Sequence, residues 1–408
     1  MEGRWVRLVR EPRWAVLAAS FVTLVLVHGA TNAFPVFLVP LTREFGGLRG
    51  VTAGAFSLHN LVVGLTATAV DPLMGRFGER RVFLIGTLIL GAGLGLVGAA
   101  RSPLELFLSF SLVAGLGAGV LGSVAQTVML SRWFPTARGT VVGLALSGMG
   151  IGLFLAAPLS AFLIERVGWR AAFGILAGGT VLLLLPTHAL APAGEARFHT
   201  AGGVGLGRAA EPGVRAILWT PRFWCFALAF FLTPVSNLMV ASHQVAHMVD
   251  AGMDPRRAAT AFGLVGLLSA VGRAGFGALS DRWERVPTAL VSYGATVLGT
   301  LALLGIAPGA PGWLLPAYVV LFGLTFGARG PIVAALVADL YPARSYGVVL
   351  GLLTLGNRLG SAVGPWLGGV IYDLTGSYRA AFAVAVAALV VAAATLAGAG
   401  RGAAPVAR

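Results

Sequence analysis

The chain has 408 residues, of which 57% are hydrophobic and only 11% are charged. A water-soluble protein of this length needs far more charge to cover its surface, so the composition excludes a soluble globular protein. A net charge of +14 would by itself suggest a nucleic-acid partner. All of the basic residues are arginines, however, and membrane topology explains their positions more simply. We therefore expect no nucleic-acid partner.

Apolar segments long enough to cross a bilayer follow one another along almost the whole chain. In chain order they are predicted at 14–40, 52–73, 82–100, 103–128, 138–164, 170–191, 219–249, 256–280, 288–307, 312–339, 345–372 and 378–399. Arginines are concentrated before the first segment and in alternate connections, so the positive-inside rule places both termini in the cytoplasm. The sequence predicts an all-α, multi-pass protein of the cell (inner) membrane with twelve transmembrane helices.

The second half of the sequence repeats the first. "EPRWAVLAASFV" from Glu11 matches "TPRFWCFALAFF" from Thr220, and "GWRAAF" ending at Phe173 matches "SYRAAF" ending at Phe382. Between these pairs, "FPTARGTVVGLALSGMGIGLFLAAP" matches "YPARSYGVVLGLLTLGNRLGSAVGP" in the same order. The repeats predict two pseudo-symmetric six-helix bundles, 1–191 and 219–408, joined by a cytoplasmic loop at 192–218. Two such bundles form a cleft at the middle of the membrane that rocking opens to either side, which is typical of transporters.

Three arginines lie inside predicted spans: Arg273 in the eighth, Arg329 in the tenth and Arg358 in the eleventh. Each charge costs about 2.5–3.5 kcal/mol at a helix centre, and no carboxylate lies near the middle of any predicted span. A guanidinium pairs well with a carboxylate, so the three cations predict an anion-binding cavity in the C-terminal half. Two alternatives remain. Arg273 could extend to lipid headgroups, and Arg329 and Arg358 could bond backbone carbonyls at neighbouring helix ends.

Uncharged polar side chains also fall inside predicted spans. His28 and Asn32 share one face of the first helix, and Asn237 and His243 lie on the seventh, so we expect them as substrate contacts. His243 and His247 are also spaced to hold a metal or simply to pack between helices. No third ligand is evident, so we expect no metal and no cofactor. No nucleophile–base pair is visible either, which argues against an enzyme.

The arginine-rich segments after the second and eighth spans, "MGRFGERRV" and "GALSDRWERV", resemble the signature loops of the major facilitator superfamily. In that family the loops latch helix ends in one conformation. The residues to which the resemblance assigns this gating role are Arg76, Gly78, Arg80, Asp281, Arg282 and Arg285. The first loop has Gly75 where the family usually carries aspartate, which would weaken its latch. These arginines could also serve membrane topology alone.

A narrower resemblance covers about residues 14–395. "AFPVFLVPLTREF", "SRWFPTARGTVVGLALSGMGIG" and "VGRAGFGALSDR" are similar to segments of monocarboxylate transporters and oxalate:formate antiporters. In both groups an arginine of helix 8 holds the substrate carboxylate, and its match is Arg273. The chain departs from the first group at Val36, where a lysine is usual, and at Ser269, where an acid is usual. The second group has a helix 11 lysine, and the nearest positions here are Asn357 and Arg358.

These observations predict a secondary active or facilitative transporter of small organic anions, mono- or dicarboxylates, that works by alternating access as a monomer. Its coupled partner would be a counter-anion or a proton. The missing lysine and acid favour anion exchange or facilitated diffusion. One alternative is efflux of amphipathic drug-like compounds, which would not depend on Arg273. Another is a receptor or scaffold, which would need a folded soluble domain or a long tail to signal through.

Overall fold

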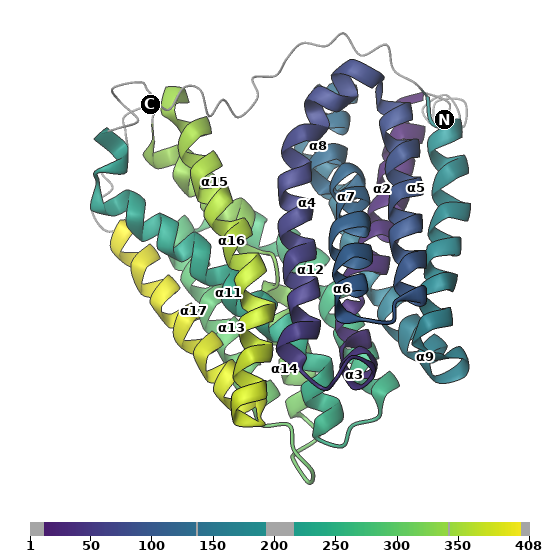
Figure 1. Cartoon of the computed structure of the whole chain (residues 1–408). Helices are drawn as coiled ribbons and strands as arrows, with labels where there is room; N and C mark the ends of the chain where they lie inside the picture. Colours follow the sequence, from purple (N-terminus) through teal and green to yellow (C-terminus); the bar gives the residue numbers. More distant parts are fainter. Residues whose placement is uncertain (1–11, 136–137, 193–215, 342, 401–408) are drawn as a thin grey trace, which may run out of the picture. The chain divides into compact units, whose positions relative to one another are not determined.

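The computed structural model describes residues 12–135, 138–192, 216–341 and 343–400, and their regular structure is entirely helical (Figure 1). Ten helices among them are long and apolar enough to cross a membrane. One of these, α9 (Arg138–Leu190), contains two spans, since Gly168 interrupts it with φ 79°. A further span is divided between two short helices, α14 (Leu314–Thr325) and α15 (Arg329–Leu340). The total agrees with the twelve predicted spans.

The remaining helices follow the predicted segments closely. In the first half of the chain they are α2 (Pro12–Asn32), α3 (Phe34–Glu44), α4 (Arg49–Phe77), α5 (Glu79–Ala99), α6 (Pro103–Leu106), the π-helix η1 (Phe107–Ala114), α7 (Gly115–Leu121) and α8 (Ser123–Trp133). In the second half they are α11 (Pro221–Asp250), α12 (Pro255–Arg282), α13 (Arg285–Leu304), α16 (Ala343–Thr375) and α17 (Tyr378–Gly400).

The chain forms two compact units. The first contains the described residues up to Leu41 together with those from Leu58 to 192. The second contains Thr42–Ser57 and the described residues from 216 onwards. The short segment Thr42–Ser57, which belongs to the first sequence repeat, thus groups with the second unit. Most of the predicted loop at 192–218 lies outside the described residues.

Small residues let the helices within each unit pack closely. In the first unit α2 packs along α9, and a Cβ at Gly152 of α9 would lie only 2.1 Å from the backbone oxygen of Val25. In the second unit α11 packs against α16 and α17 (Figure 1). There a Cβ at Gly360 would lie 2.2 Å from the backbone oxygen of Phe231. Moving an apolar side chain from lipid to a helix interface gains no hydrophobic free energy, because lipid tails are equally apolar. Close backbone contacts of this kind therefore supply much of the packing energy.

The tenth span is interrupted in its middle, and this break positions the candidate site. α14 ends at Thr325, α15 begins at Arg329, and Gly327 between them has φ 84°. Such a positive φ is accessible mainly to glycine. Interrupted helices are tolerated at membrane depth where protein or a cavity, rather than lipid, surrounds the freed backbone groups.

Candidate functional site

Arg273 lies on α12 against the break between α14 and α15. The side chain runs close to Gly327, so that a Cβ there would lie 3.7 Å from Arg273 Cδ and 3.9 Å from its Nε and Nη1. The preceding residue, Gly272, has no room for a side chain, because a Cβ there would lie 1.8 Å from the backbone oxygen of Leu324. Helix α12 therefore packs directly against the end of α14 at Gly272. Arg273, the next residue, places its side chain beside the break.

The guanidinium of Arg273 turns back along its own helix. Its Nε donates to the backbone oxygen of Ser269 at 3.1 Å, and its Nη2 donates to Ser269 Oγ at 3.3 Å. This direction leads towards the beginning of α12 and away from its nearer end at Arg282. A side chain that extended to the lipid headgroups at the nearer end would point the opposite way. The geometry therefore argues against the headgroup alternative.

Arg329, the first residue of α15, is only 4% exposed and is bonded on several sides. Its Nη1 donates to the backbone oxygen of Ser292 at 3.0 Å and to Thr296 Oγ1 at 2.8 Å. Its Nη2 donates to Asn237 Oδ1 at 2.9 Å, and the guanidinium carbon lies 4.6 Å from the ring centroid of Tyr293. The structure thus brings two predicted site residues, Arg329 and Asn237, into direct contact.

Hydroxyl groups extend these contacts into a buried network. Thr296 Oγ1 lies 2.7 Å from Thr325 Oγ1, and the Tyr293 hydroxyl lies 2.6 Å from Thr233 Oγ1. We call the whole set the Arg329 cluster; it consists of Thr233, Asn237, Ser292, Tyr293, Thr296, Thr325 and Arg329. All of its acceptors are neutral. Among the residues that the structure describes, no carboxylate pairs with Arg329, so its positive charge is not neutralised.

Arg358 lies half-buried on α16 and does not join the Arg329 cluster. It makes no hydrogen bond or ion pair with any residue in the described part of the chain. The neighbouring Asn357 donates from Nδ2 to the backbone oxygen of Phe230 on α11 at 3.4 Å. The alternative for both arginines was that they bond backbone carbonyls. Arg329 does bond one, that of Ser292, in addition to side chains. Arg358 bonds none in the described part of the chain.

The predicted contacts of the first unit lie at a second interruption. His28 and Asn32 occupy the last turn of α2, just before the chain turns at Ala33 into α3, and both are half-buried. Elsewhere in this unit His59 is buried, with Nδ1 3.0 Å from the backbone oxygen of Phe110. The ring of His59 also stacks on the ring of Phe110. His28 and Asn32 are thus the predicted residues that flank a helix interruption in this unit.

His243 has protein partners at both ring nitrogens. Its Nε2 lies 2.8 Å from the backbone oxygen of Pro365, which can only accept, so Nε2 carries the proton. Nδ1 then accepts from the Tyr378 hydroxyl at 3.2 Å. His247 bonds the backbone oxygen of Leu303 at 3.0 Å. These contacts favour helix packing over a metal, and no group of three metal-ligating side chains occurs among the described residues.

Arg49, the first residue of α4, forms a cluster that the sequence analysis did not identify. Its Nη1 and Nη2 donate to the two carboxylate oxygens of Asp250 at 2.6 and 2.9 Å, and Nη1 also donates to the Tyr378 hydroxyl at 2.6 Å. The backbone NH groups of Arg49 and Gly50 donate to the two oxygens of Asp373 at 2.8 and 2.7 Å. The guanidinium carbon of Arg49 also lies 3.9 Å from the ring centroid of Tyr372. We call this set the Arg49 cluster; it consists of Arg49, Gly50, Asp250, Tyr372, Asp373 and Tyr378.

The members of the Arg49 cluster were overlooked because each is a single polar residue at a helix end. Such residues are expected in any membrane protein, where they face the interface. The partners are also far apart in sequence, since Asp250 follows Arg49 by 201 positions and Tyr378 follows it by 329. The occurrence of Tyr378 in the repeated "SYRAAF" segment was the one available signal.

Each unit holds an ion pair near its signature loop. In the first, Arg132 at the end of α8 donates to Asp71 at 2.5 Å and to Glu79, the first residue of α5, at 3.2 Å. In the second, Arg285 at the start of α13 pairs with Asp339 near the end of α15 at 2.6 Å. Arg285 is thus a predicted loop residue that forms an ion pair.

The other predicted loop residues are mostly at the surface. The guanidinium of Arg76 lies 5.3 Å from the ring centroid of Phe77, and Gly78 has φ 83° where α4 turns into α5. Arg80 and Arg282 are exposed. Asp281 belongs to α12, but its side chain lies outside the described part of the structure. The gating role of these residues therefore remains a prediction.

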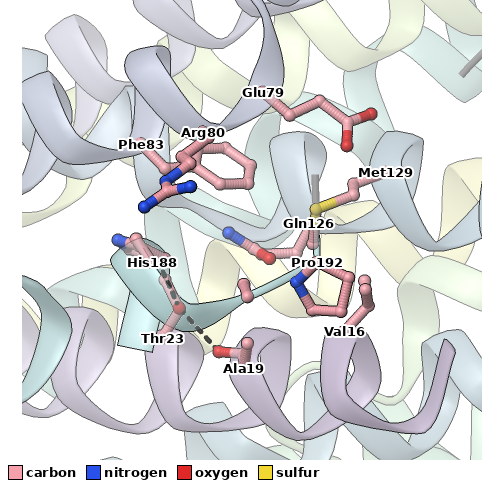
Figure 2. A pocket seen from close by; sticks show the side chains of 11 residues that line it. Val16, Ala19, Thr23, Glu79, Arg80, Phe83, Gln126, Met129, His188 and Pro192 are labelled. Carbon is pink, nitrogen blue, oxygen red and sulfur yellow. Dashed lines mark hydrogen bonds between the residues drawn. The ribbon is translucent and has the colours of Figure 1, made fainter. Parts of the chain in front are cut away.

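A small pocket lies in the first unit beside His188, a residue that the sequence analysis did not select. Figure 2 shows Gln126, Phe83 and Arg80 among the side chains that line it. His188 bonds Thr23 Oγ1 at 2.9 Å and Thr87 Oγ1 at 3.0 Å. The cavity measures about 20 Å³, enough for roughly one water molecule and far below the size of an organic ligand site. It is therefore not a candidate for substrate binding.

Comparison with known proteins identifies the class. A model of the Major Facilitator Superfamily matches residues 19–351 and 304–405, so the chain belongs to this superfamily. It is accordingly a multi-pass membrane transporter and not an enzyme.

Within the superfamily the chain is similar to the monocarboxylate transporters over most of its length. Monocarboxylate transporter 13 of Bos taurus is 28% identical over 373 residues, which cover 91% of this chain and 85% of the relative. Monocarboxylate transporter 11 of Mus musculus is 30% identical over 386 residues, which cover 91% and 83%. The resemblance noted in the sequence is confirmed at this level.

Two solved structures show the same fold. A bacterial homologue of the human lysosomal transporter Spinster, in an inward-facing and unoccupied conformation, matches with a TM-score of 0.75 and 16% identity over 96% of this chain and 98% of that chain. A mutant of the nucleoside transporter NupG matches with a TM-score of 0.77 and 13% identity over 96% and 100%. At these identities the likeness concerns the fold alone.

Proposed function

We propose that this protein transports small organic anions, mono- or dicarboxylates, by alternating access, and that Arg273 binds the carboxylate. The observation that carries the proposal is the position of Arg273 beside the interrupted tenth span, with its guanidinium directed back into α12 rather than towards the nearer helix end. Interrupted helices commonly form the substrate sites of secondary transporters. The relatives named as monocarboxylate transporters support the same substrate class.

The other polar residues have supporting roles in this proposal. Arg329 and Arg358 add positive charge that favours an anion, since neither is paired with a carboxylate in the described part of the chain. His28 and Asn32 offer neutral hydrogen-bonding groups at the interruption between α2 and α3. The protein works as a monomer, with both termini on the cytoplasmic side of the cell (inner) membrane.

Coupling by anion exchange or facilitated diffusion fits the residues better than proton symport. Arginine does not release its proton at accessible pH, so Arg273 does not carry a proton through the cycle. Ser269, which accepts from Arg273, is neutral where monocarboxylate transporters carry an acid. Uptake into liposomes that continued without an internal counter-anion and collapsed with the pH gradient would contradict this coupling.

The binding step is tested by ligand-induced thermal stabilisation of the purified protein. A ligand that binds the folded state raises the apparent melting temperature by mass action. We expect one or more short carboxylic acids to stabilise the wild type and Arg257→Gln, and not to stabilise Arg273→Gln. Arg257 is the matched control, because it is an exposed arginine on the same helix. If no acid stabilises the wild type, or Arg273→Gln responds equally, efflux of amphipathic compounds becomes the better explanation.

A further inference from the structure

The interruption of the tenth span needs support from outside its own backbone. Thr325 ends one half-helix and Arg329 begins the other. Of the connecting residues, Phe326 donates to the backbone oxygen of Phe322 at 2.9 Å and Ala328 donates to that of Thr325 at 3.2 Å. Gly327, with φ 84°, has no side chain that could hold the connection in place. Side-chain contacts of the two flanking residues can therefore add support from neighbouring helices.

Both flanking residues are bonded to the same side chain on α13. Arg329 Nη1 donates to Thr296 Oγ1 at 2.8 Å, and Thr325 Oγ1 lies 2.7 Å from the same oxygen. Thr296 donates its own proton to the backbone oxygen of Ser292 at 2.8 Å, so its oxygen can accept from both neighbours. Thr325 then donates to Thr296 in place of the backbone oxygen of Leu321, which lies 2.9 Å from Thr325 Oγ1. One hydroxyl group of α13 thus ties the end of α14 to the start of α15.

The break in turn supports Arg273. Gly327 lies against the side chain of Arg273, and Leu324, one residue before Thr325, has its backbone oxygen against Gly272. A movement of the break would change the space beside the guanidinium. The bonds of Arg329 to Asn237, Ser292 and Thr296 engage both of its terminal nitrogens and hold the guanidinium between α11 and α13.

We propose that Arg329 is a positioning residue, which acts with Thr296 and Thr325 to hold the break of the tenth span in the place where Arg273 meets a carboxylate. This inference rests on the proposed carboxylate transport and assigns Arg329 a role that differs from substrate contact. It also explains why a permanent charge is buried at the start of α15. The five N–H donors of a guanidinium are spread over three nitrogens, so it can donate to α11 and α13 simultaneously, whereas a neutral amide has two donors on one nitrogen.

The decisive variant is Thr325→Val, which removes the hydroxyl and keeps the volume. Its matched control is Thr300→Val, because Thr300 is equally buried and lies on α13 one turn beyond Thr296. Within the described part of the chain its hydroxyl bonds only the backbone oxygen of Thr296, at 2.9 Å. We expect Thr325→Val to raise the KM for the transported acid about three- to tenfold, the usual effect of one buried hydrogen bond. The maximal rate per folded transporter should change less than twofold. Arg329→Lys, which keeps the charge and loses the fork of donors, should behave in the same way as Thr325→Val.

A second measurement needs no substrate. Hydrogen–deuterium exchange followed by mass spectrometry should become faster in the peptide that spans the break in Thr325→Val, and should stay unchanged there in Thr300→Val. Unchanged exchange in Thr325→Val would overturn the inference whatever the substrate is. Faster exchange with an unaltered KM would also overturn it, because the cluster would then be structural only. Failure of every acid to bind the wild type is a separate outcome, which removes the proposed function and with it the role assigned to Arg329.

Discussion

Two arginine clusters in the second unit have opposite charge balance. In the Arg49 cluster the guanidinium bonds the carboxylate of Asp250 and the hydroxyl of Tyr378, while a second carboxylate, Asp373, accepts from the backbone NH groups of Arg49 and Gly50. The Arg329 cluster surrounds one guanidinium with neutral acceptors from Asn237, Thr296 and Ser292. A neutralised arginine is suited to holding helix ends together, whereas an arginine without a carboxylate leaves positive charge available to an anion.

The two units show a related contrast at their signature loops. Arg132 pairs with Glu79 in the first unit, and Arg285 pairs with Asp339 in the second. Asp339 is the repeat counterpart of Arg132, and Arg285 lies one position beyond the counterpart of Glu79. The signs are therefore reversed while the helix ends that meet are the same. Both repeats thus have an ion pair between these helix ends, with the charges in opposite order.

The largest expected effect comes from removing the cation of the Arg49 cluster. Arg49→Gln would leave the carboxylate of Asp250 without its counter-charge, while Asp373 would keep its two backbone NH donors. We expect a loss of about 2 kcal/mol, since charge-assisted hydrogen bonds contribute more than neutral ones and both partners are partly shielded from solvent. The check is the apparent melting temperature in detergent. Arg379→Gln, at an exposed arginine near the same helix ends, should change it little. Equal melting temperatures for the two variants would show that the Arg49 cluster adds nothing to stability.

Arg358 provides the next test, because it is half-buried and has no partner in the described part of the chain. If it supplies a second cation to the site, Arg358→Gln should weaken the binding of a dicarboxylate about tenfold and that of a monocarboxylate less than twofold. Affinities from titrated thermal shifts would separate the two classes of acid. An equal loss for both classes, or for neither, would exclude Arg358 as the ligand of a second carboxylate.

Asn237→Asp would make the Arg329 cluster resemble the Arg49 cluster. The new carboxylate keeps an acceptor for Arg329 Nη2 and neutralises its charge, so position is retained while the electrostatic contribution is lost. We expect the KM for the transported acid to rise about threefold, less than the effect of removing a bound cation. Asn237→Ala is the companion variant, which removes the acceptor and leaves the charge. An unchanged KM in Asn237→Asp would mean that the charge of Arg329 does not reach the substrate.

The smallest effect is expected at the surface pair. Arg285→Asp or Asp339→Arg alone should destabilise the second unit by about 0.2–1 kcal/mol, because exposed ion pairs contribute little. The double variant with the charges exchanged should recover most of that loss, since the first unit already carries the opposite order. Denaturation by detergent titration can compare the four proteins. No recovery in the double variant would show that the order of charges matters after all.

The fold was predictable because its signals are local. Each span is a run of apolar residues, so its bounds could be read from composition alone, and the repeated segments revealed the duplication. The division of the tenth span was not foreseen, since "LTFGARG" is as apolar as its surroundings apart from Arg329. Only the positive φ of Gly327 shows that the helix stops there.

The site was predictable in part. A charge inside an apolar span is conspicuous in a sequence, which is why Arg273, Arg329 and Arg358 were selected. The partners were not conspicuous, because Thr296, Thr325 and Asn237 are ordinary residues whose importance depends on a neighbour from another helix. The sequence by itself determined the twelve spans, the duplication and the excess of positive charge, since burial in lipid acts on each segment separately. Tertiary structure decided which arginine is neutralised, which is held by hydroxyls and which lies beside the break, because those outcomes depend on helices that meet only after folding.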